Sequence, residues 1–185
     1  MILSHKGILQ GIKQGTVDIS PFNESNLGAN SYDVSLNAHL LVYSSERLDC
    51  RNENKTEEFI IPASGFVLYP GELYLGRTNE TACSKAFVPM YEGRSSIGRL
   101  GISSHITAGF GDIGWGYDKD GNCLFPTWTL EITVVKEVVV YPNIRIGQVY
   151  FVSTDDSSFM YQGKYSQQKE TQASLSFRDK EFLDK

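Results

Sequence analysis

Eight short β-forming runs, separated by turn-forming residues, constrain the fold of this chain more than any other feature. Each run is rich in Val, Ile, Leu, Tyr or Phe, and Gly, Pro, Asn or Ser separates it from its neighbours. Alternating runs with this punctuation and spacing are typical of antiparallel sheets. We therefore expect a mainly β protein, built as a sandwich or a barrel. The runs are 31–36, 40–44, 57–63, 65–70, 72–78, 128–135, 137–142 and 148–153.

Only the first stretch of the chain has the pattern of a helix. Ser4 is a candidate N-cap, Ile8 and Ile12 fall on one face, and Gly15 is a helix stop. The length of 185 residues fits a single domain, 1–185, that buries a sizeable core. The segment 158–185 ends in a polar and poorly periodic stretch, which composition alone would make a frayed, flexible tail.

Charge and composition exclude several classes of protein. The net charge of −5 argues against a broad nucleic-acid surface, so a bound anion must be held by a local cluster. No window approaches the roughly 20 apolar residues that span a bilayer, and the start lacks the pattern of a secretory signal. Cys50, Cys83 and Cys123 form neither a disulfide framework nor a CxxC metal pair. We expect a cytoplasmic protein with no nucleic-acid or membrane partner.

The segment 91–102 concentrates cations and hydroxyls in a chain that is acidic overall. Arg94, Ser95, Ser96 and Arg99 lie among three glycines. Glycine lets a ligand approach the backbone closely, and guanidinium forks bind phosphate in a bidentate manner. An anion cradle and a polar turn with locally paired arginines are equally compatible with these residue types. The apolar residues of the segment are expected to face the core; they are Tyr91, Ile97, Leu100 and Ile102.

Two carboxylates lie in apolar surroundings further along the chain. Asp112, in a Gly-rich stretch, is suited to hydrogen-bond a sugar hydroxyl or to cap a turn. Glu131 lies between Leu130 and Ile132 in a β-forming run, so its side chain points to the opposite face of the strand. Burial on that face would raise the pKa of the carboxyl, as suits a general base. The alternative is an outward-facing Glu on an amphipathic strand.

Six sequence blocks, in order, resemble the deoxycytidine triphosphate (dCTP) deaminase family, a branch of the dUTPase-like superfamily. The resemblance covers nearly the whole chain. It implies a dUTPase-like distorted β-barrel or jelly-roll sandwich with a short N-terminal helix and a C-terminal lid. The blocks are "SYDVSL", "LYPGELYLGRTNE", "GRSSIGRLGI", "HITAGFGDIGW", "TLEI" and "KYSQQ".

The resemblance implies a role for each matched residue. Glu131 falls on the general base that activates water for attack on cytosine C4, and Ser95 and Arg99 on residues that position this water and stabilise the developing charge. His105 matches a position without an assigned role, where a structural histidine is expected. The substrate-binding matches are Arg94, Ser96 and Tyr161 for phosphate, Asp112 for the 3′-hydroxyl, the backbone at Thr129 and Leu130 for the base, and Lys164, Tyr165 and Gln168 for the closing tail.

The family also implies the cofactors and partners. The zinc deaminase signature, H-x-E with P-C-x-x-C, is absent from the sequence, so a zinc-free reaction is expected. Mg²⁺ is expected only as the partner of the triphosphate. The resemblance further implies a homotrimer with active sites between neighbouring subunits, and dTTP as a plausible inhibitor.

Departures from the family pattern keep several functions open. Residues 116–128 are an insertion, in which 118–122 favour a tight hairpin turn, while Ile113 and Val134 replace the family's usual Pro and Asn. The main hypothesis is deamination of dCTP to dUTP. A bifunctional enzyme that also releases pyrophosphate and yields dUMP is nearly as well supported, since "TAGF" resembles that branch and Asp112 is a candidate base for the second water. Two less favoured hypotheses are a diphosphatase that acts on dUTP only and a regulator that binds nucleotides.

Overall fold

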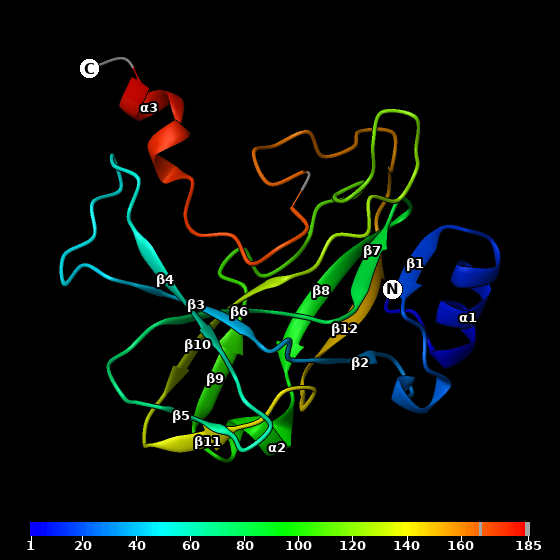
Figure 1. Ribbon diagram of the computed structural model, residues 1–185. Coiled ribbons are helices and arrows are strands. Elements are labelled where there is room, and N and C mark those ends of the chain that lie inside the picture. Colours follow the sequence, from blue (N-terminus) through cyan, green and yellow to red (C-terminus); the bar gives the residue numbers. More distant parts are fainter. Residues whose placement is uncertain (167, 184–185) are drawn as a thin grey trace.

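The computed structural model describes residues 1–166 and 168–183, and these form a mainly β structure (Figure 1). Gln167 and residues 184–185 of the predicted tail lie outside the described residues. The strands are β1 (Val17–Ser20), β2 (Tyr32–Ser35), β3 (His39–Tyr43), β4 (Thr56–Ile60), β5 (Phe66–Leu68), β6 (Tyr74–Arg77), β7 (Thr81–Ser84), β8 (Phe87–Gly93), β9 (Ile102–His105), β10 (Thr129–Val134), β11 (Val138–Val140) and β12 (Arg145–Ser153).

Four antiparallel sheets make up the described part of the chain. The largest has the strand order β4-β3-β6-β10-β9, and a second sheet has the order β2-β12-β8. Two smaller ribbons, β1-β7 and β11-β5, complete the set. In neither of the two larger sheets is the first strand paired with the last, so both sheets stay open. The predicted mainly β class is confirmed, and all eight predicted runs contain a strand.

The helices are short and more numerous than the sequence pattern predicted. The expected helix is α1 (His5–Lys13), where the Ser4 hydroxyl accepts a hydrogen bond from Gly7 N at 3.3 Å as the predicted N-cap. The expectation of a single helical stretch is wrong, because α2 (Ser95–Gly98) and α3 (Lys180–Leu183) are also helical. Two 3₁₀ turns, η1 (Glu24–Asn26) and η2 (Ser176–Arg178), are present as well. Such single turns are too short to show a helical period in a sequence. No helix in the described ranges is long and apolar enough to cross a membrane.

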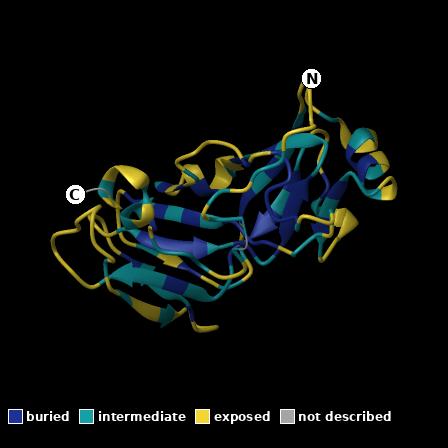
Figure 2. Cartoon of the chain, turned by 90° about the horizontal axis from the view of Figure 1, so that it is seen from above, coloured by how far each residue is buried: buried dark blue, intermediate teal, exposed yellow. Residues whose placement is uncertain are grey.

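The buried residues run through the middle of the molecule and form one core (Figure 2). It includes Ile8 of α1, Leu130 of β10 and Phe151 of β12, all fully buried. In the segment 91–102 the predicted inward positions are buried except Leu100, which is 59% exposed. Leu100 lies beyond the end of α2, where the chain turns into β9, and so faces solvent.

Strand β12, late in the sequence, pairs with segments from the beginning of the chain. It pairs with β2 in the register Val149 to Tyr32, and Leu3 N donates to Phe151 O at 2.9 Å. The Ser31 hydroxyl donates to the Gln148 side chain across 117 positions of sequence. The sheet that anchors the N-terminal residues is therefore completed only by the last long strand.

The inserted residues 116–128, here called the insertion hairpin, form the turn that the sequence predicted. Tyr117 pairs with Cys123, and Asp118 N donates to Asn122 O at 3.0 Å. The Asn122 side chain donates to the Asp118 carboxylate at 3.0 Å, and the backbone N–H groups of Asn122 and Asp120 also donate to it. These hydrogen bonds lower the pKa of Asp118. The hairpin is thus closed by its own polar groups.

Candidate active site

A cavity of about 560 Å³ lies between the five-stranded sheet and the C-terminal segment 158–183. Its walls bring together the tail, strand β10 and the loop that follows β9. Six of the predicted site residues line it; they are Glu131, Asp112, Thr129, Tyr161, Tyr165 and Gln168. This set combines carboxylates, a hydroxyl, an amide and aromatic rings, which suits a ligand with both a flat ring and polar groups.

Glu131 is held at the cavity wall by the alternation of β10. Its neighbours Leu130 and Ile132 are fully buried on the other face of the strand. The Thr107 hydroxyl donates to Glu131 Oε2 at 2.6 Å, and His105 Nε2 lies 3.5 Å from the same oxygen. The Glu131 side chain is 30% exposed, so within one chain it is neither fully buried nor fully exposed to solvent. The His105 side chain is 51% exposed, so this histidine lies outside the core and beside the Glu131 carboxylate.

Asp112 presents a free carboxylate to the cavity. Its side chain is exposed and makes no hydrogen bond with the described residues, while its backbone oxygen accepts from Trp115 N at 3.1 Å. Asp112 therefore takes part in a turn through its backbone oxygen, but its side chain does not cap that turn. The side chain remains available for a ligand.

Two tryptophans that the sequence did not mark as site residues form part of the cavity wall. The rings of Trp115 and Trp128 lie 4.7 Å apart at 48°. Trp115 Nε1 donates to Tyr165 O at 3.1 Å, and Trp128 Nε1 donates to Ala82 O at 3.0 Å. Trp115 comes just before the insertion hairpin and Trp128 is its last residue. Because the two ends of a hairpin lie close together, this placement could have indicated that both rings belong to one cavity wall.

The tail is docked on β10 through its glutamines. Gln168 Nε2 donates to Thr129 Oγ1 at 2.5 Å and to Thr127 O at 3.0 Å. The Gln172 backbone N–H donates to the same Thr129 hydroxyl oxygen at 3.0 Å. This part of the segment therefore lies against the body of the protein, while the flexibility expected of it stays a prediction.

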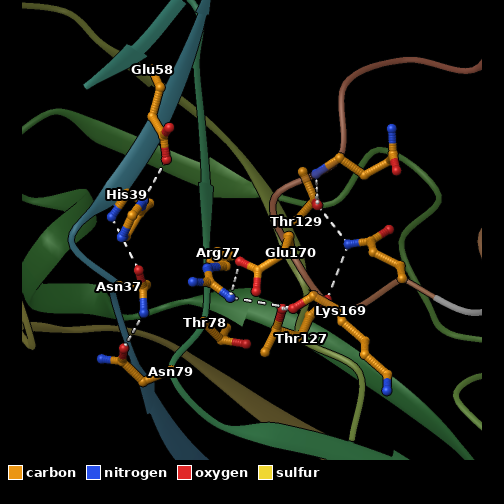
Figure 3. A network of polar contacts seen from close by, with 12 residues as sticks. Asn37, His39, Glu58, Arg77, Thr78, Asn79, Thr127, Thr129, Lys169 and Glu170 are labelled. Atoms are coloured by element: carbon orange, nitrogen blue, oxygen red, sulfur yellow. Dashed lines mark hydrogen bonds and ion pairs between the residues drawn. The ribbon is translucent and has the colours of Figure 1, made fainter. Parts of the chain in front are cut away.

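A second set of contacts clamps the tail to β6 (Figure 3). Arg77 Nη1 lies 2.6 Å from the Glu170 carboxylate and donates to Lys169 O at 3.2 Å. The Thr127 hydroxyl donates to the same Lys169 oxygen at 2.9 Å. The Arg77 Nε atom is buried without a partner among the described residues. Arg77 was not predicted as a site residue, although it lies within the "LGRTNE" block.

Lys164 and Tyr165 are occupied within the tail itself. The Lys164 ammonium pairs with Asp179 at 2.5 Å, and the Tyr165 hydroxyl accepts from Leu175 N at 3.0 Å. Lys164 does not line the cavity, whereas the Tyr165 ring does. A triphosphate contact by Lys164 would require exchange of its partner Asp179.

The Arg and Ser cluster stands apart from the cavity of its own chain. Ser95, Ser96 and Arg99 are exposed on or beside α2, and none of them lines the cavity. Arg94 pairs with Asp33 at 3.3 Å, which matches the polar-turn alternative for that residue. Strand β9 lies between the two sites, since Glu131 pairs with His105 at the far end of β9 from α2 (Figure 1). The cavity and the cluster therefore occupy different ends of one strand.

The arrangement of sheets matches a solved structure. It resembles the crystal structure of 2′-deoxycytidine 5′-triphosphate deaminase from Agrobacterium tumefaciens, with a TM-score of 0.57 and 19% identity. The match covers 81% of this chain and 47% of that one, so this chain spans about half the length of its neighbour. The fold is accordingly of the dUTPase-like class.

Sequence comparison defines the family. The family model described as dCTP deaminase-like matches residues 2–154. A Clostridium botulinum (strain Eklund 17B / Type B) protein named "dCTP deaminase, dUMP-forming" is 48% identical over 181 residues, covering 97% of this chain and 98% of its own. A Cytophaga hutchinsonii protein of the same name is 43% identical over 180 residues, with coverages of 97% and 98%. The chain belongs to the dCTP deaminase-like family.

Proposed function

We propose that this protein deaminates dCTP by hydrolysis and also cleaves the triphosphate, so that dUMP, ammonia and pyrophosphate leave. The observation that carries this proposal is the name shared by its relatives, which are called dUMP-forming at up to 48% identity along almost their full length. That name favours the bifunctional alternative over the main hypothesis, in which dUTP is the final product. The free Asp112 carboxylate and the "TAGF" sequence support the same choice.

Glu131 is the proposed general base. Its carboxylate would take a proton from water as the oxygen attacks C4 of cytosine, and would return a proton to the departing nitrogen. The hydrogen bond from Thr107 and the proximity of His105 support this role, because both hold Oε2 of a carboxylate whose residue lines the cavity. The backbone at Thr129 and Leu130 is proposed to read the edge of the base.

Ser95 and Arg99 act on the water and the developing charge only if another copy of the chain supplies them. The distance between α2 and the cavity within one chain supports the homotrimer that the resemblance implies, with each cavity completed by the cluster of a neighbour. Arg94, Ser96, Tyr161 and Lys164 are proposed to contact phosphate, with Tyr165 and Gln168 closing the tail over it.

The second hydrolysis needs a water aimed at the α-phosphorus. Asp112 is the proposed base or anchor for this water, because its carboxylate has no other hydrogen-bond partner among the described residues. Mg²⁺ is proposed to accompany the triphosphate, held mainly by phosphate oxygens and water. The proposed reaction uses no zinc, and dTTP is proposed to compete for the same cavity.

The test is an incubation of the purified protein with dCTP and Mg²⁺, followed by nucleotide separation and assays of ammonia and pyrophosphate. Parallel samples hold dUTP, dCTP with added dTTP, and chelator-treated protein resupplied with Mg²⁺ alone. We expect ammonia, pyrophosphate and dUMP in the dCTP samples, with less of each when dTTP is present. Accumulation of dUTP would restore the monofunctional hypothesis. Turnover of dUTP alone would indicate a diphosphatase, and no turnover of either would favour a regulator.

A further inference from the structure

The fold brings together two cysteines that the sequence keeps 40 positions apart. Cys83 Sγ of β7 lies 3.7 Å from Cys123 Sγ of the insertion hairpin, and both are free thiols. Cys83 is fully buried, whereas Cys123 is partly exposed. The absence of a CxxC spacing excluded a local pair, but this long-range pair was not visible in the sequence.

The surroundings give the two sulfurs different chemistry. Phe125 N donates to Cys123 Sγ at 3.4 Å. A hydrogen bond from Cys83 lowers the pKa of Cys123, and the Phe125 amide adds to this effect. The same hydrogen bond raises the pKa of Cys83, and burial raises it further. The remaining titratable neighbours are Asp18 and Tyr117, which hydrogen-bond each other at 2.5 Å. Cys123 is the accessible sulfur and accepts the hydrogen bond of the Phe125 amide, so it is the better nucleophile of the two.

We propose that Cys83 and Cys123 form a reversible disulfide when the protein meets a small-molecule disulfide. In the first step the Cys123 thiolate attacks one sulfur of the oxidant, whose S–S bond breaks and releases one thiol after protonation. In the second step Cys83 gives its proton to solvent and its sulfur attacks Cys123, which releases the second small thiol. The two protein thiols are oxidised, and one disulfide is reduced to two thiols.

The bond would reshape one wall of the cavity. A disulfide holds its sulfurs at about 2.05 Å, so the two atoms must approach each other from their contact distance. Cys83 is fixed in the core by the pairing of β7 with β1, so the insertion hairpin makes the movement. The hairpin begins after Trp115 and ends at Trp128, and both rings line the cavity. The chain has only these two tryptophans, so their fluorescence reports the movement.

The experiment uses the full chain with Cys50→Ser, which removes the exposed third thiol and leaves the pair untouched. The reduced protein is incubated with oxidised glutathione, digested without reductant and analysed by peptide mass. We expect both thiols to be lost together, a peptide in which 83 is linked to 123, a shifted tryptophan emission and a higher Tm. Dithiothreitol should reverse all four changes.

Two further variants on the same background separate the steps. With Cys123→Ser, Cys83 should stay a free thiol; with Cys83→Ser, Cys123 should retain one glutathione as a stable mixed disulfide. The proposal is overturned if both thiols of the Cys50→Ser protein stay titratable under oxidant that modifies Cys50 in the unaltered chain. Linkage of Cys50 to either thiol in the unaltered chain, with no 83–123 peptide, would also overturn it. None of these readouts depends on catalytic activity.

Discussion

At the scale of single residues, Glu131 depends on the pleat of β10 for its direction and on Thr107 for its rotamer. The alternation was readable from the sequence because Leu130 and Ile132 are apolar on either side. The Thr107 contact was not, because it joins two segments 24 positions apart.

Substitution of Glu131 by Gln should lower kcat for deamination by about 10²- to 10⁴-fold, because the amide cannot accept the proton of the attacking water. Nucleotide binding should persist, since shape and hydrogen bonding are nearly kept. Steady-state kinetics and calorimetric titration with dCTP measure the two effects. Glu57→Gln, the same change at an exposed position of β4, is the control and should leave both unaffected. Retained deamination in Glu131→Gln would remove the residue from its assigned role.

The other site residues differ in how far the sequence allowed their place in the site to be predicted. Asp112, Thr129 and Gln168 were named from the family blocks and do line the cavity. Trp115 and Trp128 were missed because a tryptophan in a β-rich chain is ordinarily read as core, and both are indeed mostly buried. Only their ring contact and their common cavity distinguish them.

At the scale of elements, strands within strongly β-forming apolar runs were predictable and strands outside such runs were not. Strand β8 was not predicted because it includes Pro89, a residue that argues against a strand. The proline is tolerated there because β8 lies at the edge of its sheet. β7 and β9 are each four residues long and mix small polar with apolar side chains. Such strands form because their neighbours pair with them, and a local pattern does not hold that information.

The tail should behave as a part of the site. A chain ending before Lys164 loses the Gln168, Lys169 and Glu170 contacts, so the KM for dCTP should rise and kcat should fall. A chain ending at Asp179 keeps these contacts and the Lys164 ion pair, and it should retain nearly full activity. Kinetics of both truncated proteins measure the difference. Equal activity of the two would show that the docked segment is a bystander.

The base of the insertion hairpin depends on a glycine. Gly116 has φ +82°, and a Cβ there would lie 2.1 Å from the Pro126 ring. Gly116→Ala should therefore destabilise the protein by about 2–4 kcal/mol, through backbone strain and overpacking together. Gly121 has the same backbone conformation with open space around it. Gly121→Ala should cost only the strain, about 1–2 kcal/mol, in a urea titration. Similar losses for both would mean that contact with Pro126 is relieved at no cost.

At the scale of the whole molecule, the separation of α2 from the cavity leads to a prediction about mixtures. Arg99→Ala and Glu131→Gln should each be inactive alone. Unfolding and refolding the two together should restore about a quarter of the wild-type activity, since random assembly pairs an intact cavity with an intact neighbouring cluster at that frequency. Refolded wild-type protein sets the scale, and sedimentation velocity tests whether the refolded protein forms the proposed trimer. No recovery from mixed trimers would place Arg99 and Glu131 in sites that are not shared.

The late pairing of β2 with β12 has a consequence for synthesis on the ribosome. The nascent chain exposes Tyr32 and Val34, both fully buried in the finished fold, long before their partner strand is made. The Ser31 to Gln148 span of 117 residues takes on the order of ten seconds to translate. During that interval an unpaired apolar strand is open to other nascent chains. Slow codons between 36 and 145 would lengthen the exposure, and the yield of soluble protein should fall with them.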